Sequence, residues 1–412
     1  MSRRHVPFLV LLLVMAALMS AGRAADWPQW RGPNRDGVAA GVGLPAKWPE
    51  KLTRRWSVPV GEGHATPVLS GDRVLVHSRE GDNEAARSLK LADGSTVWTR
   101  SWPVPYQMHS AATGHGKGPK SSPAFIGGTF YTLSINGTLN ALDPDTGQIR
   151  WTREMSSRYK ATSPLFGVAA SPAVDGGLIV APFGGHHDGT LAALDVKTGE
   201  QKWGLDGDGP GYASPIIAEL AGVKQVITQT DQRVVGVEAA TGKLLWSVPI
   251  TTPYDQNSVT PVVAGDLLLI SGLEYGLRAF AIERAGDKMA AREVWASKEA
   301  SLYMSSPVLT GGRLFGFTHN KKGQLVCVDP KTGATIWAGP DSLGDYAALV
   351  AAGPVVMALT EGAELIVMSS STPAYSELAR YKVADSPTWA HPVPTTDGVL
   401  IKDRTNLTLW TW

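Results

Sequence analysis

The chain has 412 residues, a formal net charge of +1 at pH 7, 45 glycines, 28 prolines and 14 tryptophans. A net charge near zero gives no general signal for polyanion binding, so nucleic acid is excluded as the expected partner. The single cysteine, Cys327, excludes an intramolecular disulfide framework. The glycine and proline content favours many short strands and turns over helices.

The first predicted element is an export signal. Two arginines precede an apolar run over residues 8–19, which is shorter than the roughly 20 residues that a membrane-spanning helix needs. Small residues before Ala25 provide a cleavage site, so residues 1–24 are predicted to be a signal peptide. No cysteine follows this site, so we expect a mature protein without a membrane anchor, in the periplasm or outside the cell.

One repeat dominates the rest of the chain. The segment ALDPDTGQIRW at residues 141–151 returns in similar form at residues 193–203, 236–246 and 327–337. Upstream of these and related units, a Ser/Thr–Pro pair begins an apolar stretch. Each unit therefore predicts four short strands: a proline-led A strand, an apolar B strand, a C strand and a D strand with tryptophan. The pairs begin at Thr66, Ser122, Ser171, Ser214, Thr260 and Ser306.

The turn between the C and D strands explains the residue types of the repeat. Asp143, Asp195 and Asp329 begin this turn, where an Asp side chain accepts hydrogen bonds from backbone N–H groups two residues on. The glycine that follows supplies the positive φ that a hairpin of this kind requires. The tryptophan then buries a large ring. We interpret the Asp residues as structural rather than catalytic.

The spacing of the tryptophans gives the number of blades. Two weaker units follow Trp337, and the last has only three plausible strands, whereas Trp56 marks a D strand with no A to C strands before it. We expect this N-terminal strand to complete the C-terminal unit. The sequence thus predicts an all-β fold, a single eight-bladed β-propeller of four-stranded antiparallel blades, with seven blades as the alternative. The marker residues are Trp56, Trp98, Trp151, Trp203, Trp246, Trp295 and Trp337.

Together with the segment DWPQWRGPNRDG at residues 26–37, the repeats resemble those of bacterial PQQ-like, tryptophan-docking propeller proteins. The resemblance implies that residues 25–50 pack on a propeller formed by residues 51–412, and that the tryptophan rings pack between neighbouring blades. It points to two functional branches. One comprises quinoprotein dehydrogenases, which hold pyrroloquinoline quinone and calcium over the propeller centre. The other resembles the scaffold protein of the outer-membrane β-barrel assembly machine.

This sequence departs from both branches. The dehydrogenase pattern includes an adjacent cysteine pair, whereas Cys327 is alone and aligns with Ala141 and Ala193 in the C strand. A haem-attachment motif is also missing from the sequence. The assembly scaffold is usually lipid-anchored, and this sequence lacks the lipid-accepting cysteine. We therefore predict no cofactor and keep pyrroloquinoline quinone with calcium as the alternative that the resemblance implies.

Strand order assigns the connections to two faces. The D-to-A and B-to-C connections share one face, which we call the loop-rich face, and the regular turns lie on the other. The D-to-A connections on either side of the second blade are the longest and are rich in basic residues. Long loops on a rigid ring usually carry binding residues, and basic groups suit an anion or an acidic protein loop. The candidate binding residues are His64, His109, Lys120, Arg158, Lys160 and Tyr212.

The third residue before each A-strand proline is predicted to surround the mouth of the central channel. These residues differ between blades, which favours a ligand site or partner surface over a symmetric structural ring. They are His64, Lys120, Ala169, Tyr212, Ser258, Met304 and Trp389. The adjacent His186 and His187 are candidates for metal binding, but the sequence shows no matching ligand set, so no metal site is predicted.

These features predict an exported, monomeric, non-catalytic module that binds a small anionic ligand or a protein partner through the loop-rich face. One alternative is an enzyme that uses this face, such as a divergent PQQ-dependent oxidoreductase. A second alternative is a scaffold in cell-envelope or outer-membrane protein assembly. A deep polar pocket with converging His, Lys and carboxylate groups would favour catalysis, and a shallow or apolar rim would favour a protein partner.

Overall fold

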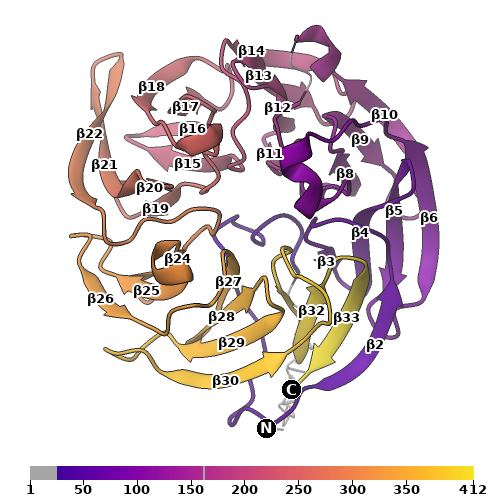
Figure 1. The fold of residues 1–412 in the computed structure, drawn as a ribbon. Coiled ribbons are helices and arrows are strands. Elements are labelled where there is room, and N and C mark those ends of the chain that lie inside the picture. The colour runs from indigo at the N-terminus through magenta and orange to yellow at the C-terminus, as the bar shows by residue number, and fades with distance from the viewer. Residues whose placement is uncertain (1–25, 161–162) are drawn as a thin grey trace, which may run out of the picture.

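The computed structural model describes residues 26–160 and 163–412, so the predicted signal peptide lies outside the described residues. The described chain forms eight sheets arranged around a central axis (Figure 1). The predicted eight-bladed β-propeller is therefore confirmed. In this part of the chain every helix is a short 3-10 turn, and none is long and apolar enough to cross a membrane.

Blades 1 to 4 each consist of four consecutive strands, with the first strand nearest the axis (Figure 1). Blade 1 contains β3 (Val68–Ser70), β4 (Arg73–Glu80), β5 (Asn83–Lys90) and β6 (Thr96–Pro103). Blade 2 contains β7 (Ala124–Ile126), β8 (Thr129–Leu133), β9 (Thr138–Leu142) and β10 (Ile149–Glu154). Blade 3 contains β11 (Ala173–Asp175), β12 (Leu178–Gly185), β13 (Asp188–Asp195) and β14 (Gln201–Asp206). Blade 4 contains β15 (Ile216–Leu220), β16 (Val223–Gln229), β17 (Arg233–Glu238) and β18 (Leu244–Pro249).

Blades 5 and 6 follow the same plan, and blade 7 gains a strand. Blade 5 contains β19 (Val262–Ala264), β20 (Leu267–Gly272), β21 (Gly276–Ala285) and β22 (Lys288–Ser297). Blade 6 contains β23 (Val308–Thr310), β24 (Arg313–Thr318), β25 (Gln324–Val328) and β26 (Thr335–Ala338). Blade 7 contains β27 (Ala347–Ala352), β28 (Val355–Thr360), β29 (Glu364–Ser369) and β30 (Glu377–Lys382). The N-terminal β1 (Val38–Ala39) pairs in parallel with β27 on the side facing the channel.

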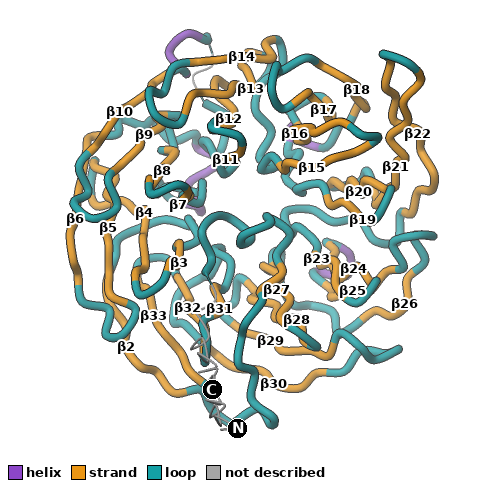
Figure 2. Tube along the Cα trace, turned by 180° about the vertical axis from the view of Figure 1, so that it is seen from behind, coloured by secondary structure: helices purple, strands orange, loops and turns teal. Residues whose placement is uncertain are grey.

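Blade 8 joins the two ends of the described chain. It contains β31 (Val393–Pro394), β32 (Gly398–Lys402), β33 (Asn406–Thr411) and, as its outer strand, β2 (Thr53–Pro59). The antiparallel strands β2 and β33 lie side by side in both views of the ring (Figures 1 and 2). Closure by the N-terminal strand, predicted from Trp56, removes the exposed sheet edges that an open ring would present.

The loop-rich face carries the 3-10 turns. These are η1 (Ser110–His115), η2 (Ser156–Arg158), η3 (Pro253–Asp255) and η4 (Asn320–Lys322). Figure 1 views the ring from this face, and Figure 2 shows the opposite side. All four turns lie in D-to-A or B-to-C connections, as the strand bounds show. The predicted division into a face of variable connections and a face of regular turns is thus visible in the fold.

The docking tryptophans explain why the repeat needs its glycine. The Trp151 ring lies on Gly199 of the next blade, so closely that a Cβ on this glycine would come within 2.8 Å of the ring. Gly199 also has a φ of +69°, and its turn carbonyl at Val196 accepts a 3.0 Å hydrogen bond from Trp151 Nε1. The glycine therefore serves both the turn and the close approach of the ring. Four further tryptophans, Trp56, Trp98, Trp203 and Trp295, donate to the next blade in the same way.

A ring of hydrogen bonds explains the Ser/Thr–Pro signature. In each case the hydroxyl of one blade accepts a hydrogen bond from the backbone N–H at the same position of the preceding blade. The donors are His391, Thr66, Ser122, Ser171, Ser214 and Thr260, and the respective acceptors are Thr66, Ser122, Ser171, Ser214, Thr260 and Ser306, at 2.8–3.2 Å. The signature therefore joins blades 8 and 1 to 6 around the channel.

Two buried arginines of the N-terminal segment bind the carbonyls of the same signature. Arg35 donates to the carbonyl oxygens of Ser171, Pro172 and Pro215 at 2.7–2.9 Å. Arg31 donates in the same manner to the Ser306 carbonyl at 2.9 Å and to the Pro307 carbonyl. Burial lowers the pKa of both guanidinium groups. The segment thus fixes blades 3, 4 and 6 from inside the channel, as the indigo trace crossing the centre of Figure 1 shows.

Arg35→Met should strongly destabilise the ring. The variant would leave three buried carbonyl groups without their donor, and each such group costs roughly 1–3 kcal/mol. We expect a loss of at least about 3 kcal/mol in the free energy of unfolding, measured by denaturant titration. Arg54→Met is the matched control, since Arg54 is exposed on β2. Equal effects of the two substitutions would contradict the role given to Arg35.

Trp151→Ala should cost more than Asp143→Ala. Trp151 is only 9% exposed, and removal of a buried aromatic side chain costs about 3–5 kcal/mol through the cavity that it leaves. Asp143 instead accepts hydrogen bonds from exposed turn residues, including the backbone N–H of Thr146 at 3.0 Å. Thermal unfolding of both variants checks the order. A larger loss in the Asp143 variant would show that the turn, and not the docked ring, dominates the repeat.

Candidate functional site

A cavity of about 390 Å³ lies at the centre of the loop-rich face. Most of its wall comes from the D-to-A connections of successive blades, and His319 and Glu361 come from B-to-C connections. Trp30 of the N-terminal segment also lines it. The volume is at the lower end of the range for small-molecule sites, roughly 300–1,000 Å³. The structure thus places a pocket on the face where the sequence predicts binding.

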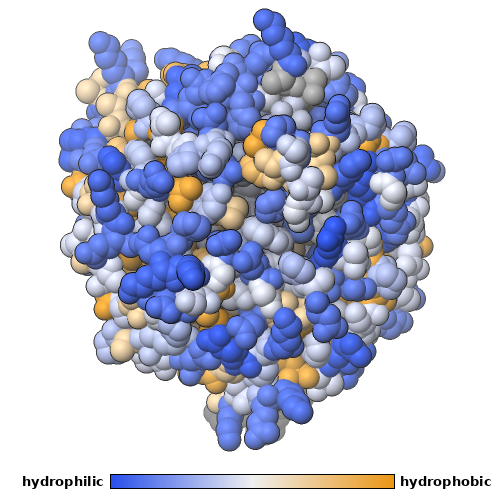
Figure 3. Space-filling view, in the orientation of Figure 1, coloured by the Kyte–Doolittle hydropathy of each residue, from blue (hydrophilic) through white to orange (hydrophobic). Residues whose placement is uncertain are grey.

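The surface around the cavity is mainly hydrophilic. In the space-filling view, apolar residues are scattered among polar ones and form no broad patch (Figure 3). Large protein interfaces usually have a more apolar centre that is depleted in charged residues. The cavity is therefore the most distinctive binding feature of this face.

The position three residues before each A-strand proline leads directly into the cavity. All seven residues that the sequence singles out at this position line the wall: His64, Lys120, Ala169, Tyr212, Ser258, Met304 and Trp389. The hydroxyl ring fixes the backbone two residues further on, so each side chain is held at a similar height in the channel. Three candidate binding residues, His64, Lys120 and Tyr212, are thereby brought together in one cavity.

The other three candidates lie outside the described cavity wall. His109 is exposed and its Nδ1 accepts a 3.2 Å hydrogen bond from the backbone N–H of Ala111, which caps η1. Arg158 is exposed and donates to Gln201 Oε1 at 3.2 Å. The backbone N–H of the exposed Lys160 donates to Asp188 at 2.6 Å. The predicted basic rim is thus divided into a cavity part and a surface part, and its role in binding stays a prediction.

Lys120 is the only lysine or arginine among the described residues of the cavity wall. Its Nζ donates one long hydrogen bond, 3.4 Å, to the carbonyl of Gly116. Burial lowers its pKa to about 8, although the charge of Glu84 acts in the opposite direction. Between the described residues, Lys120 takes part in no ion pair. A desolvated ammonium with unused donors is suited to binding an anion from the cavity.

Three histidines of the cavity wall, His64, His115 and His391, are neutral at physiological pH. Burial lowers the pKa of His64 and of His391 to about 3, with further lowering by nearby cations. Burial and Lys120 also lower the pKa of His115. The Nε2 of His64 lies 2.9 Å from the carbonyl oxygen of His115, so this ring donates a hydrogen bond in the tautomer that fits. The anion-binding charge in this region therefore belongs to Lys120.

Aromatic rings form the apolar part of the wall. Trp389 stacks on Tyr346 with ring centroids 4.8 Å apart and planes inclined by 17°. The edge of His115 meets Trp389 at a centroid distance of 5.0 Å, and Phe166 meets Tyr212 at 5.9 Å. Stacked and edge-to-face contacts hold these rings in fixed orientations. The cavity consequently offers flat apolar surfaces beside its single ammonium group.

Two carboxylates lie elsewhere on the wall. Asp345 is exposed in the connection between blades 6 and 7, and Glu361 is partly buried in the B-to-C connection of blade 7. The backbone N–H of Asp345 donates to Glu361 Oε1 at 2.9 Å. Blades 8 and 1, with Trp389 in the connection that leads into blade 8, separate this acidic pair from Lys120 around the ring. The cavity therefore has a basic and an acidic region.

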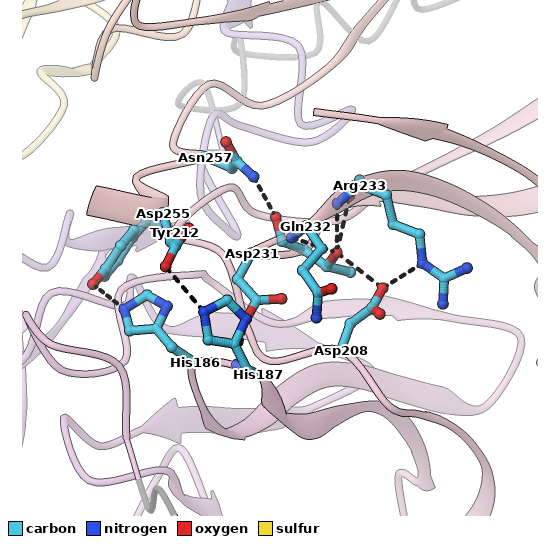
Figure 4. A network of polar contacts seen from close by, with 10 residues as sticks. His186, His187, Asp208, Tyr212, Asp231, Gln232, Arg233, Asp255 and Asn257 are labelled. Carbon is cyan, nitrogen blue, oxygen red and sulfur yellow. Dashed lines mark hydrogen bonds and ion pairs between the residues drawn. The ribbon is translucent and has the colours of Figure 1, made fainter. Parts of the chain in front are cut away.

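His186 and His187 belong to a polar network beside the cavity (Figure 4). His186 Nε2 lies 3.1 Å from the hydroxyl of Tyr212. The ring of His187 lies between Asp231 and Asp255, with a nitrogen 3.3 Å from a carboxylate oxygen of each. Among the described residues, no group of three or more His, Cys, Asp or Glu side chains is arranged to hold a metal ion. These contacts connect blades 3 and 4 and hold the Tyr212 wall in place.

Sequence reasoning missed several cavity residues. Trp30 reaches the cavity only because its segment crosses the channel, where it contacts Arg31 and Arg35 at 5.5 and 5.8 Å. No repeat position marks Tyr303, Tyr346 or Glu361, whose placement depends on the path of individual loops. The WRGPNR motif was the available signal for Trp30, since two arginines so close to a tryptophan indicate a site of dense contacts.

The cavity residues do not fit pyrroloquinoline quinone with calcium. This cofactor carries several carboxylates, which require several cationic partners, and the described wall offers one ammonium. Calcium prefers several carboxylate and carbonyl oxygens, and the described residues contain no group of three or more His, Cys, Asp or Glu side chains that could hold a metal ion. Cys327 is fully buried in β25, where burial raises its pKa to about 11. The described cavity wall thus combines the fold shared with the quinoproteins with a single ammonium group.

The repeats, the docked tryptophans and the closed eight-bladed ring define a PQQ-like β-propeller protein. Residues 82–339 match the family described as outer membrane protein assembly factor BamB. The match covers more than half of the chain, which therefore belongs to this family.

Relatives matched along the sequence agree with this assignment, and solved structures share the fold. The outer membrane protein assembly factor BamB of Yersinia pestis is 26% identical over 260 residues, which are 63% of this chain and 60% of the relative. The crystal structure of BamB from Moraxella catarrhalis has a TM-score of 0.62 and 18% identity, and the match covers 88% of this chain and all of the other. A quinohemoprotein alcohol dehydrogenase of Pseudomonas putida gives a TM-score of 0.69 at 14% identity, covering 94% and 80%. The chain spans only 60% and 51% of the first two curated relatives.

Lys120→Met should stabilise the protein at neutral pH. The pKa of Lys120 is about 8 in the folded state against 10.5 in its ordinary environment, so the unfolded chain binds more protons between these values. The free energy of unfolding of the wild type therefore rises as the pH increases from about 8 to 10.5. Below pH 8 the buried charge of Lys120 destabilises the folded state to its full extent. We expect the variant to gain on the order of 1–2 kcal/mol at pH 7 and almost nothing near pH 10.5.

Urea unfolding at several pH values measures this difference. Lys117→Met in the same connection is the matched control, since Lys117 is exposed. A stability gain that is the same at pH 7 and pH 10.5 would show that the added apolar contact, and not removal of the desolvated charge, is responsible.

Proposed function

We propose that the protein is an extracytoplasmic, non-catalytic binding module that takes an anionic group of a small ligand or of a protein partner into its central cavity. Lys120 is the observation that carries this proposal, because it is a desolvated ammonium on the cavity wall with one long hydrogen bond. A protein tolerates such a group at a cost in stability, and perturbed groups of this kind gather at functional sites.

The state of the other polar groups supports binding over catalysis. The cavity does contain His, Lys and carboxylate groups, but Lys120 and the acidic pair lie on different parts of the wall. The hydroxyls of Thr66, Ser122, Ser214 and Ser306 each accept a backbone hydrogen bond in the inter-blade ring. These bonds give the hydroxyls a structural role, whereas a catalytic nucleophile would need to donate its proton to a neighbouring base.

Family membership favours a second candidate function, a scaffold in envelope protein assembly. The relatives matched along the sequence include several named outer membrane protein assembly factor BamB. In a scaffold, the exposed residues of the loop-rich face, such as Arg158 and Lys160, would make the contacts. The two candidates therefore assign binding to different residues: the wall of the cavity for a small anion, and the surrounding surface for a partner protein.

Lys120→Gln should weaken anion binding. Charge-assisted hydrogen bonds are worth roughly 1.5–3 kcal/mol, so we expect the affinity for 3-phenylpropionate, an aromatic monoanion, to fall at least about tenfold. Isothermal titration calorimetry measures the affinity, and thermal unfolding confirms that the variant stays folded. Arg158→Gln is the control on the same face and should bind as the wild type does. The opposite pattern, with loss only in the Arg158 variant, would favour the surface over the cavity.

A further inference from the structure

The charges on the cavity wall restrict the class of anion that it can hold. Only one lysine or arginine, Lys120, lines the described wall, whereas two carboxylates, Asp345 and Glu361, share the same cavity. A polyphosphate or tricarboxylate would meet a single cation and two like charges, an arrangement that disfavours binding. The wall is thus suited to a ligand with one negative charge.

The carboxylates of Asp345 and Glu361 have few polar partners among the described residues. Between the described residues, neither Asp345 nor Glu361 takes part in an ion pair. The only hydrogen bond between them uses the backbone N–H of Asp345 and Glu361 Oε1, at 2.9 Å. The remaining carboxylate oxygens can accept hydrogen bonds from a cation. A ligand that carries a positive charge would therefore be drawn to this region.

Aromatic rings connect the two charged regions. From the side of Lys120, His64 and His115 lead to Trp389, at ring-centroid distances of 6.1 and 5.0 Å. Trp389 then stacks on Tyr346, the neighbour of Asp345. Basic group, apolar platform and acidic pair therefore follow one another along one sector of the wall. A ligand that lies along this sector needs a negative end, a flat or apolar body and a positive end.

We propose that the cavity binds a zwitterion of the amino-acid or short-peptide class, with its carboxylate at Lys120 and its ammonium at Asp345 and Glu361. This inference rests on the proposed function and adds the chemical class of the ligand. The cavity volume of about 390 Å³ suits a ligand of this size better than a folded partner domain. The part of Trp389 that is left exposed by its stacking on the buried Tyr346 would contact the body of the ligand and favour its positive end.

Three related compounds test the proposal by calorimetry on the full chain: phenylalanyl-alanine, its N-acetyl form and its C-terminal amide. We expect each blocked form to bind at least about tenfold more weakly than the dipeptide with both charged ends. Lys120→Gln should abolish the difference between the dipeptide and its amide. The double variant Asp345→Asn with Glu361→Gln should abolish the difference between the dipeptide and its N-acetyl form.

Matched controls separate this inference from the proposed function. Asp341→Asn removes an exposed acid near blade 7 and should leave all three affinities unchanged. If the N-acetyl form binds as tightly as the dipeptide while Lys120 remains essential, the zwitterion proposal is overturned and anion binding stands. The same conclusion follows if 3-phenylpropionate binds and the dipeptide does not. If neither compound binds, the proposed anion-binding function itself fails.

Discussion

The ring depends on the hydrogen bonds of its innermost strands. In every blade except blade 7 the A strand is the inner edge of the sheet, so its channel side has no neighbouring strand to pair with. In this protein the Ser/Thr hydroxyls bind the backbone N–H groups at the start of these strands, and Arg31 and Arg35 bind several of the carbonyls. Since an unpaired buried backbone group costs roughly 1–3 kcal/mol, the channel is stable only with these partners in place.

Blade 7 shows how the same constraint is met where the signature is missing. Its inner strand begins at Ala347, which has no hydroxyl, and its backbone N–H donates backward to Ser305 of blade 6 at 3.1 Å. The inner edge of β27 is then covered by β1, whose pairing includes the hydrogen bond from Ala351 to the carbonyl of Gly37 at 2.8 Å. The N-terminal segment therefore supplies hydrogen-bond partners to the inner strand of blade 7 through the strand β1. It supplies partners to blades 3, 4 and 6 through arginine side chains.

The fold could be predicted from the sequence because its determinants are local. Each repeat contains its turn aspartate, its turn glycine and its docked tryptophan within about a dozen residues, so the strands of each blade can be predicted from a short stretch of sequence. Closure by β2 could be predicted by counting strands, because Trp56 marks a D strand without A to C strands before it and the last unit has only three strands. The added strand β1 was missed, because two residues carry no periodic pattern.

The cavity could be predicted only in part, because the repeat fixes some of its residues and the paths of individual loops fix the others. Residues such as Lys120 and Trp389 occupy a fixed position before the proline, and the repeat geometry carries that position to the channel wall. Arg158 and Lys160 belong to a loop whose length and charge suggested binding, but loop length says nothing about the direction in which a loop runs. Trp30 and Tyr346 depend on contacts between segments far apart in the chain, which no local pattern records.

The arginine contacts and the candidate site are physically one system. Trp30 lines the cavity, and it lies against Arg31 and Arg35, which have bonds to carbonyls but no carboxylate partner between the described residues. Their charge reaches the wall, since Arg31 contributes to the low pKa of His391. Burial is the main cause of the low pKa of His391, and the positive charge that holds the ring together lowers this pKa further. Because buried charges act over long distances in a weakly polarisable interior, the arginines that stabilise the scaffold would also contribute to the potential that the proposed ligand meets in the cavity.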